Sequence, residues 1–190
     1  MKRPFIILLS VSLLLSACGG ARRARVEKSR MLHALKIEDF YSFMGVSKGD
    51  TYAKALELWG EPSKEELNEG TKLNFATVYY HGEDGERLFS LTYDKRDNTL
   101  NHIRLTGSKV VNFSSTQEFF KNRGLYDVKT QLLGMHRDSI LSVFGDPTRI
   151  KGSDYIYEGK GINVTFVCYD FGENRCEEIY VFWNYFYKPE

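Results

Sequence analysis

The sequence repeats one residue pattern twice, and this repeat limits the possible folds more than any other feature. Residues 49–62 read Gly-Asp-Thr-Tyr-Ala-Lys-Ala-Leu-Glu-Leu-Trp-Gly-Glu-Pro, and residues 134–147 read Gly-Met-His-Arg-Asp-Ser-Ile-Leu-Ser-Val-Phe-Gly-Asp-Pro. The glycines, a leucine, an aliphatic residue, an aromatic residue, an acid and the proline recur in register. Matching segments follow in the same order: 78–80 with 155–157, 91–94 with 167–170, and Ile103 with Ile179. The chain is therefore expected to contain two copies of one structural unit.

Each copy has the pattern of a short helix followed by antiparallel strands. Apolar residues recur at helical spacing in both copies (Ala55, Leu56 and Trp59; Ile140, Leu141 and Phe144). The glycine after each aromatic residue can adopt the left-handed conformation that ends a helix, and the proline two residues later prevents its continuation. Alternating apolar residues, separated by turns rich in Gly, Asp and Asn, then predict three strands. A further helical stretch precedes each copy, at 32–44 and from the capping box Ser115-Thr-Gln-Glu118 onwards.

These elements predict an α+β fold of two tandem helix-helix-three-strand units, whose antiparallel strands form one sheet with helices packed on one face. The expected repeats span residues 31–106 and 107–190. Strand alternation places the following side chains on the sheet face opposite the helices: Ser90, Thr92, His102, Arg104, Phe166, Cys168, Tyr180 and Phe182. Aromatic groups beside polar ones are typical of a protein-binding surface. The alternative is that a helix, the N-terminal tether or the aromatic C-terminal segment covers this face.

The N-terminus has the pattern of an export signal. Lys2 and Arg3 precede an apolar run, residues 5–15, which is shorter than the roughly 20 residues that a membrane-spanning helix needs. Residues 1–17 are therefore predicted to be a signal peptide. The following tetrad, Leu15-Ser-Ala-Cys18, resembles the lipobox of bacterial lipoproteins, and this resemblance implies lipid attachment at Cys18. The alternative is an ordinary secretory signal with an incidental cysteine.

Residues 18–30 are expected to form a lipidated, flexible, basic tether. The segment contains five Lys and Arg residues and no apolar periodicity, which is typical of a solvated linker. The alternative is that its positive side chains rest on anionic lipid headgroups. Gly19 stands where an aspartate would favour inner-membrane retention in lipoproteins of the enteric type. The expected location is therefore the outer membrane, through the lipid anchor, with the folded part facing the periplasm.

The charge distribution argues against nucleic-acid binding. The chain has a formal net charge of +1, but residues 1–30 hold seven of its 26 basic residues and one of its 25 acids. The remaining residues therefore carry 19 positive and 24 negative charges, a net charge of −5. A nucleic-acid-binding domain needs a basic patch on its folded surface, and a mildly acidic body on a basic tether argues against one.

Two cysteines remain after Cys18. Cys168 and Cys176 flank a Gly- and Asn-containing turn and would lie opposite each other in a hairpin. In an exported protein such a pair predicts a disulfide bond. The alternatives are two free thiols, or a metal pair that lacks its other ligands.

The Gly-Met…Leu-x-x-Phe-Gly-Asp-Pro element at 134–147, which recurs with Asp, Trp and Glu in place of Met, Phe and Asp at 49–62, resembles, with the strands that follow it, the unit of β-lactamase-inhibitor-protein-like (BLIP-like) domains. One such unit forms the outer-membrane assembly lipoproteins of the SmpA/OmlA/BamE type, and two in tandem form the secreted β-lactamase inhibitor protein. The resemblance covers residues 32–187 and implies the fold more specifically than the function. In inhibitors of this fold a loop inserts an acid and an aromatic residue into the enzyme, and Asp84 and Tyr80 are the nearest counterparts here. Exposed turn residues are the alternative interpretation.

The sequence offers no catalytic constellation and no cofactor motif. The four histidines (His33, His81, His102 and His136) are scattered, and neither a Gly-x-Ser-x-Gly elbow nor a phosphate-binding glycine loop is present. Glu65, Glu66 and Glu69 are interpreted as loop or helix-end charges. No metal, cofactor or enzymatic activity is therefore expected.

The leading hypothesis is a non-enzymatic, membrane-anchored lipoprotein that binds another envelope protein, in outer-membrane assembly or maintenance. A second hypothesis is a proteinaceous inhibitor of a hydrolase such as a β-lactamase. A third is a small-molecule or lipid-binding protein that uses the aromatic sheet face. The sequence carries no signal for an oligomeric state.

Overall fold

The computed structural model describes residues 29–67, 74–83, 85–106, 113–125, 127–169 and 174–183. The chain divides into two units, residues 1–34 and 35–190, and the described end of the first unit is helical at 29–33. The predicted signal peptide, Cys18, most of the tether and Asp84 lie outside the described residues. Within the described part, no helix has the length and apolar character needed to cross a membrane.

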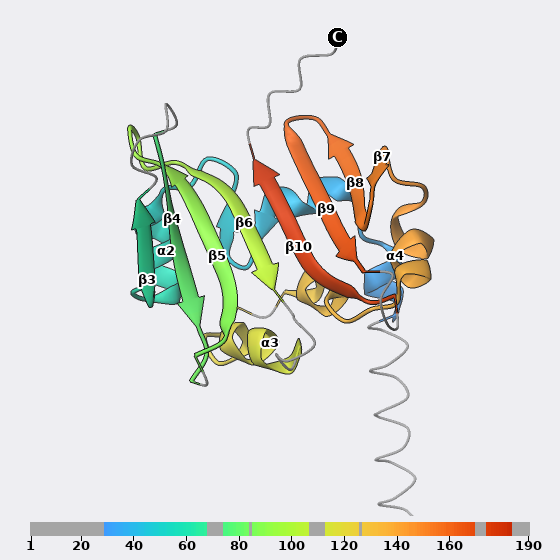
Figure 1. The fold of residues 1–190 in the computed structure, drawn as a ribbon, viewed down its shortest axis with the longest axis horizontal. Coiled ribbons are helices and arrows are strands. Elements are labelled where there is room, and N and C mark those ends of the chain that lie inside the picture. The colour runs from blue at the N-terminus through green and yellow to red at the C-terminus, as the bar shows by residue number, and fades with distance from the viewer. Residues whose placement is uncertain are drawn as a thin grey trace, which may run out of the picture. The chain divides into compact units, whose positions relative to one another are not determined.

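The second unit is built on an eight-stranded antiparallel sheet (Figure 1). Its spatial order is β3 (Lys64–Leu67), β4 (Phe75–His81), β5 (Arg87–Asp94), β6 (Leu100–Thr106), β10 (Cys176–Trp183), β9 (Ile162–Cys168), β8 (Asp154–Gly159) and β7 (Arg149–Lys151). Strands β3 to β6 and β7 to β10 form two halves, which meet where β6 pairs with β10. We call this junction the seam.

The remaining elements of this unit are short. They are the 3-10 helix η1 (Ile37–Tyr41), the two-stranded hairpin β1 (Ser42–Phe43) and β2 (Val46–Ser47), the helices α2 (Tyr52–Trp59) and α3 (Phe113–Lys121), the 3-10 helix η2 (Val128–Leu132) and the helix α4 (Arg137–Phe144). The helical stretch predicted at 32–44 is thus not one helix: residues 32–33 end the helical segment 29–33, and η1 and β1 follow. Positive φ angles at Met44 (55°) and Gly45 (88°) turn the chain into the hairpin and end any helical path there.

The helices pack on one face of the sheet. Direct cross-strand partners run along one row over four strands: Phe89, Leu105, Ile179 and Phe166. At one end of this row the Phe89 ring contacts Trp59 of α2 and Phe120 of α3, and at the other the Phe166 ring contacts Phe144 of α4. Because these partners share a face, α2, α3 and α4 all cover the same side. The predicted α+β class, with one sheet and helices on one face, is confirmed.

The two halves repeat one helix-ending contact. Helix α2 ends at Gly60 and α4 ends at Gly145, with φ angles of 79° and 75°. The Tyr80 hydroxyl donates to the Gly60 carbonyl at 3.1 Å, and the Tyr157 hydroxyl donates to the Gly145 carbonyl at 2.9 Å. The division into two tandem units stays a prediction, which these matched contacts support.

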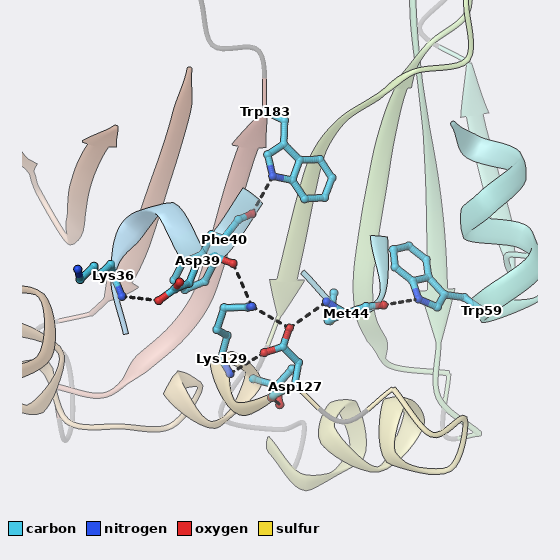
Figure 2. Close-up of polar contacts among 9 residues, drawn as sticks. Lys36, Asp39, Phe40, Met44, Trp59, Asp127, Lys129 and Trp183 are labelled. Atoms are coloured by element: carbon cyan, nitrogen blue, oxygen red, sulfur yellow. Dashed lines mark hydrogen bonds and ion pairs between the residues drawn. The ribbon is translucent and has the colours of Figure 1, made fainter. Parts of the chain in front are cut away.

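The segment 40–44 is held by two buried indoles from opposite halves (Figure 2). Trp183 of β10 donates to the Phe40 carbonyl at 2.8 Å, and Trp59 of α2 donates to the Met44 carbonyl at 3.1 Å. The Met44 N–H donates in turn to the Asp127 carboxylate at 3.1 Å. The segment therefore ties β10, α2 and the start of η2 together beneath the seam.

Candidate functional site

The candidate site lies on the sheet face opposite the helices, which we call the outer face. Cross-strand pairing brings His102 opposite Phe182 and Arg104 opposite Tyr180, across the seam. On the far side of β6, Thr92 pairs with His102 and Ser90 with Arg104. Four of the side chains that the sequence assigned to this face thus lie together at its centre: His102, Arg104, Tyr180 and Phe182.

Three rings at the seam form a parallel array, which we call the aromatic stack. The His102 ring lies 4.3 Å from Phe182 and 5.7 Å from Tyr180, centroid to centroid, with interplanar angles of 7° and 3°. The Arg104 guanidinium extends the array, since its Cζ lies 4.9 Å from the Tyr180 ring centroid. Each contact joins β6 to β10, so the stack stabilises the seam and presents flat, part-exposed groups on its surface.

An ion pair closes one end of the array. Arg104 donates to Glu178 through Nη2 at 2.8 Å and Nε at 3.1 Å, in the two-pronged geometry that gives strong, directional pairs. Glu178 is only 8% exposed, so its charge depends on this partner. Burial, followed by the neighbouring Glu178 carboxylate, raises the pKa of the Tyr180 hydroxyl.

His102 is a neutral member of the stack. The residue is part-exposed, but its Nε2 atom is buried and has no hydrogen-bond partner in the described part of the chain. Burial, and secondarily the charge of Arg104, lowers its pKa to about 4. An uncharged imidazole can stack on Phe182 without the cost of desolvating a cation.

We expect the stability of the protein to fall as the pH is lowered from about 6.5 to about 4, and His102→Phe to remove part of this loss. The unfolded chain protonates His102 near its ordinary pKa of 6.5, whereas the folded chain resists protonation down to about 4. The unfolded state thus binds more protons in this interval, and stability is lost as the pH falls through it. Thermal unfolding midpoints of both proteins across the interval test this. Parallel pH curves would show that His102 does not contribute.

Phe166 lies on the opposite face from the one predicted. It pairs directly with Ile179, is fully buried, and packs on Phe40 and Phe144 at ring distances of 6.1 and 5.2 Å. The β9–β10 register shifts between Cys176 and Glu178, and this bulge changes which residues share a face. Phe166 is therefore a core residue rather than part of the binding surface.

Tyr80 also differs from the prediction. Its side chain is 2% exposed and lies in the core beside Trp59 and Phe89, where its hydroxyl is bonded to Gly60. Asp84 lies outside the described residues. The inhibitor hypothesis therefore lacks the surface aromatic residue that the resemblance implied.

Cys168 and Cys176 are cross-strand partners, as the sequence predicted, but both are buried thiols that are not joined by a disulfide bond in this structure. The predicted disulfide bond is thus not formed here. The Cys176 thiol donates to the Glu178 carbonyl at 3.3 Å, and burial, with the neighbouring Cys168, raises its pKa well above the ordinary value. A thiol in this environment is a poor nucleophile.

A second feature of the outer face was missed at the sequence level. A hollow of about 560 Å³ lies toward the β3 edge, and its lining includes Tyr79, Arg87 and Thr106. These residues come from three strands, and the β4–β5 register shifts between Tyr80 and His81. Because the shift sets where Arg87 points, sequence alternation alone gives no signal for this group. Among the described residues, no cluster of three or more His, Cys, Asp or Glu side chains could hold a metal ion.

Comparisons with known proteins give two weak structural similarities. No family model and no curated protein matches the chain. A DUF4309 family protein (YjgB) from Bacillus subtilis subsp. subtilis str. 168 is 18% identical, with a TM-score of 0.43 over 70% of this chain and 78% of that one. An extracellular protein containing a SCP domain from Bacillus anthracis str. Ames is 9% identical, with a TM-score of 0.46 over 72% of this chain and 44% of that one. Both scores are too low to support an argument about function.

Proposed function

We propose that this protein is a non-enzymatic lipoprotein, anchored through Cys18 in the outer membrane and facing the periplasm, that binds another envelope protein on its outer sheet face. The observation that carries the proposal is the aromatic stack. His102, Tyr180 and Phe182 form a part-exposed, pre-ordered group in the middle of a sheet, on the face opposite the helices.

The stack has the physical properties of a binding hot spot. Tyrosine, tryptophan and arginine side chains are enriched among the residues that dominate binding energy at protein interfaces. Aromatic rings also bury a large area at a small cost in conformational entropy. Here the rings are already held parallel by one another and by Arg104. Binding a partner would therefore cost these side chains little further conformational entropy. The strand backbone beneath them is fixed by hydrogen bonds on both sides of β6 and β10.

Photocrosslinking in cells tests the docking face. We expect a photoreactive residue at Tyr180 or at Phe182 to capture one and the same envelope protein from the full chain. The matched control is the same photoreactive residue at Glu57, which is exposed on α2 on the helix side. Equal capture from Glu57, or capture of only abundant neighbours from Tyr180, would contradict the proposal.

The same cells test the anchor. Metabolic labelling with palmitate should label the wild-type protein but not Cys18→Ser, because the variant lacks the sulfur to which the predicted signal attaches lipid. Absence of label from the wild type, or equal labelling of both proteins, would contradict the anchoring part of the proposal.

A further inference from the structure

The hollow near the β3 edge contains two buried donors with unmet hydrogen-bonding capacity. Within the described residues, Arg87 Nε and Thr106 Oγ1 are buried and have no hydrogen-bond partner. Thr106 is 7% exposed, and both residues line the hollow. Buried polar atoms in proteins are nearly always bonded. Two such donors in one hollow therefore indicate a place where an acceptor group binds.

The charges around the hollow single out Arg87. Lys64 is paired with Glu66 at 2.6 Å, and Glu178 is paired with Arg104 at 2.8 Å. Across the described part of the chain, the Arg87 side chain forms no ion pair and its buried Nε atom has no hydrogen-bond partner. Its guanidinium lies over the Tyr79 ring, 5.7 Å from the centroid, and the Tyr79 hydroxyl is itself fixed by donating to Glu66 at 3.0 Å. A planar cation is thus held in place beside the hollow without a direct ion pair, and its charge acts on Glu66 only as the smallest of several influences that lower the pKa of that carboxylate.

We propose that this hollow binds a single carboxylate group. The Nε–H and a terminal N–H of a guanidinium are parallel donors that match the two oxygens of a carboxylate, and Arg87 Nε is the atom left without a partner. The Thr106 hydroxyl supplies another donor from the neighbouring strand. The volume of about 560 Å³ lies within the range of small-molecule sites, which is roughly 300–1,000 Å³.

The surrounding acids limit the charge of the ligand. Glu66, Glu86 and Glu178 also line the hollow. A doubly charged phosphate would meet more repulsion from these groups than a singly charged carboxylate does. The carboxylate can come from a small free acid or from the C-terminus of a peptide. The lining of this site includes none of the rings of the aromatic stack. A test of carboxylate binding here is therefore independent of a test of protein docking at the stack.

Nuclear magnetic resonance of the full chain in mild detergent tests the site, because the Arg87 Nε–H gives its own side-chain signal. The probes are acetate, a tetrapeptide with a free C-terminus, the same peptide as its C-terminal amide, and inorganic phosphate. We expect saturable shifts of the Arg87 signal with acetate and the free-terminus peptide, and none with the amide. Peptide affinity at least tenfold above that of acetate would identify a peptide end as the source, and equal affinities a free acid.

Three variants make the test specific. Arg87→Lys keeps the charge but removes the parallel donors, and Thr106→Val keeps the shape but removes the hydroxyl; each should weaken binding, the first by at least tenfold. Binding by these variants is followed through the backbone signals of β5 and β6. Arg149→Lys, at an exposed ion pair on the far edge strand, is the matched control and should leave affinity unchanged. Absence of saturable shifts with every probe, undiminished binding by Arg87→Lys, or phosphate binding as tight as acetate would each overturn the proposal.

Discussion

Trp59→Ala is expected to lower the free energy of unfolding by about 3–5 kcal/mol, the usual cost of removing a buried indole. Trp59 is 1% exposed, and its ring lies edge-on to Tyr80, Phe89 and Phe120 at centroid distances of 5.9, 5.3 and 6.0 Å. Its truncation would leave a cavity between α2, α3 and the sheet. It would also leave the Met44 carbonyl without the indole donor.

Urea unfolding followed by circular dichroism measures this loss. Trp59→Phe keeps most of the packing but removes the N–H, and should cost less than the alanine variant, about 1–3 kcal/mol. Ile150→Ala, at a side chain that is 57% exposed, is the control and should change stability by less than about 0.5 kcal/mol. A loss below about 1 kcal/mol for Trp59→Ala would show that the core beneath β4 and β5 is not packed as described.

Arg104→Met is expected to cost about 3 kcal/mol, because it leaves the Glu178 carboxylate buried without its cation. The same argument predicts that the double variant Arg104→Met/Glu178→Met recovers most of the loss. Methionine fills a similar volume in each case, so the comparison isolates the charge. In that case the ion pair would add little to the free energy of unfolding. Each residue would be needed mainly because the other charge would otherwise be buried at the seam without a partner.

A double-mutant cycle, measured by urea unfolding of the wild type, both single variants and the double variant, gives the coupling free energy between the two side chains. If the double variant is less stable than either single variant, the pair itself contributes net stability and the desolvation argument is wrong. Thr92→Val, on the outer face but outside the ion pair, serves as a control for the loss of a polar group there.

The sequence predicted the parts of the fold that depend on local chemistry. The Gly-acid-Pro endings correctly placed the ends of α2 and α4, because the glycines adopt positive φ and the prolines exclude further helix. Alternation along β6 and β10 correctly placed His102 and Arg104 beside Tyr180 and Phe182. Both strands are regular where they pair with each other, so a two-residue period was sufficient.

Prediction failed where one residue shifts the register. The irregularity between Cys176 and Glu178 reversed the expected face of Phe166, and the one after Tyr80 obscured the position of Arg87. A bulge depends on pairing with a partner strand, which a local pattern does not contain. Glu65 and Glu66, interpreted as loop or helix-end charges, belong instead to the edge strand β3, where charged residues discourage pairing with another chain.

The position of β10 determines when the sheet can be completed. It is the last strand in sequence among the described residues, yet it lies between β6 and β9. A chain delivered from its N-terminus, during synthesis or export, therefore presents open edges at β6 and β9, in addition to the edge strands β3 and β7, until residues 176–183 arrive. Open edges are templates for aggregation. This architecture thus favours delivery that keeps the chain from collapsing before residues 176–183 arrive, since neither β6 nor β9 can pair with β10 any earlier.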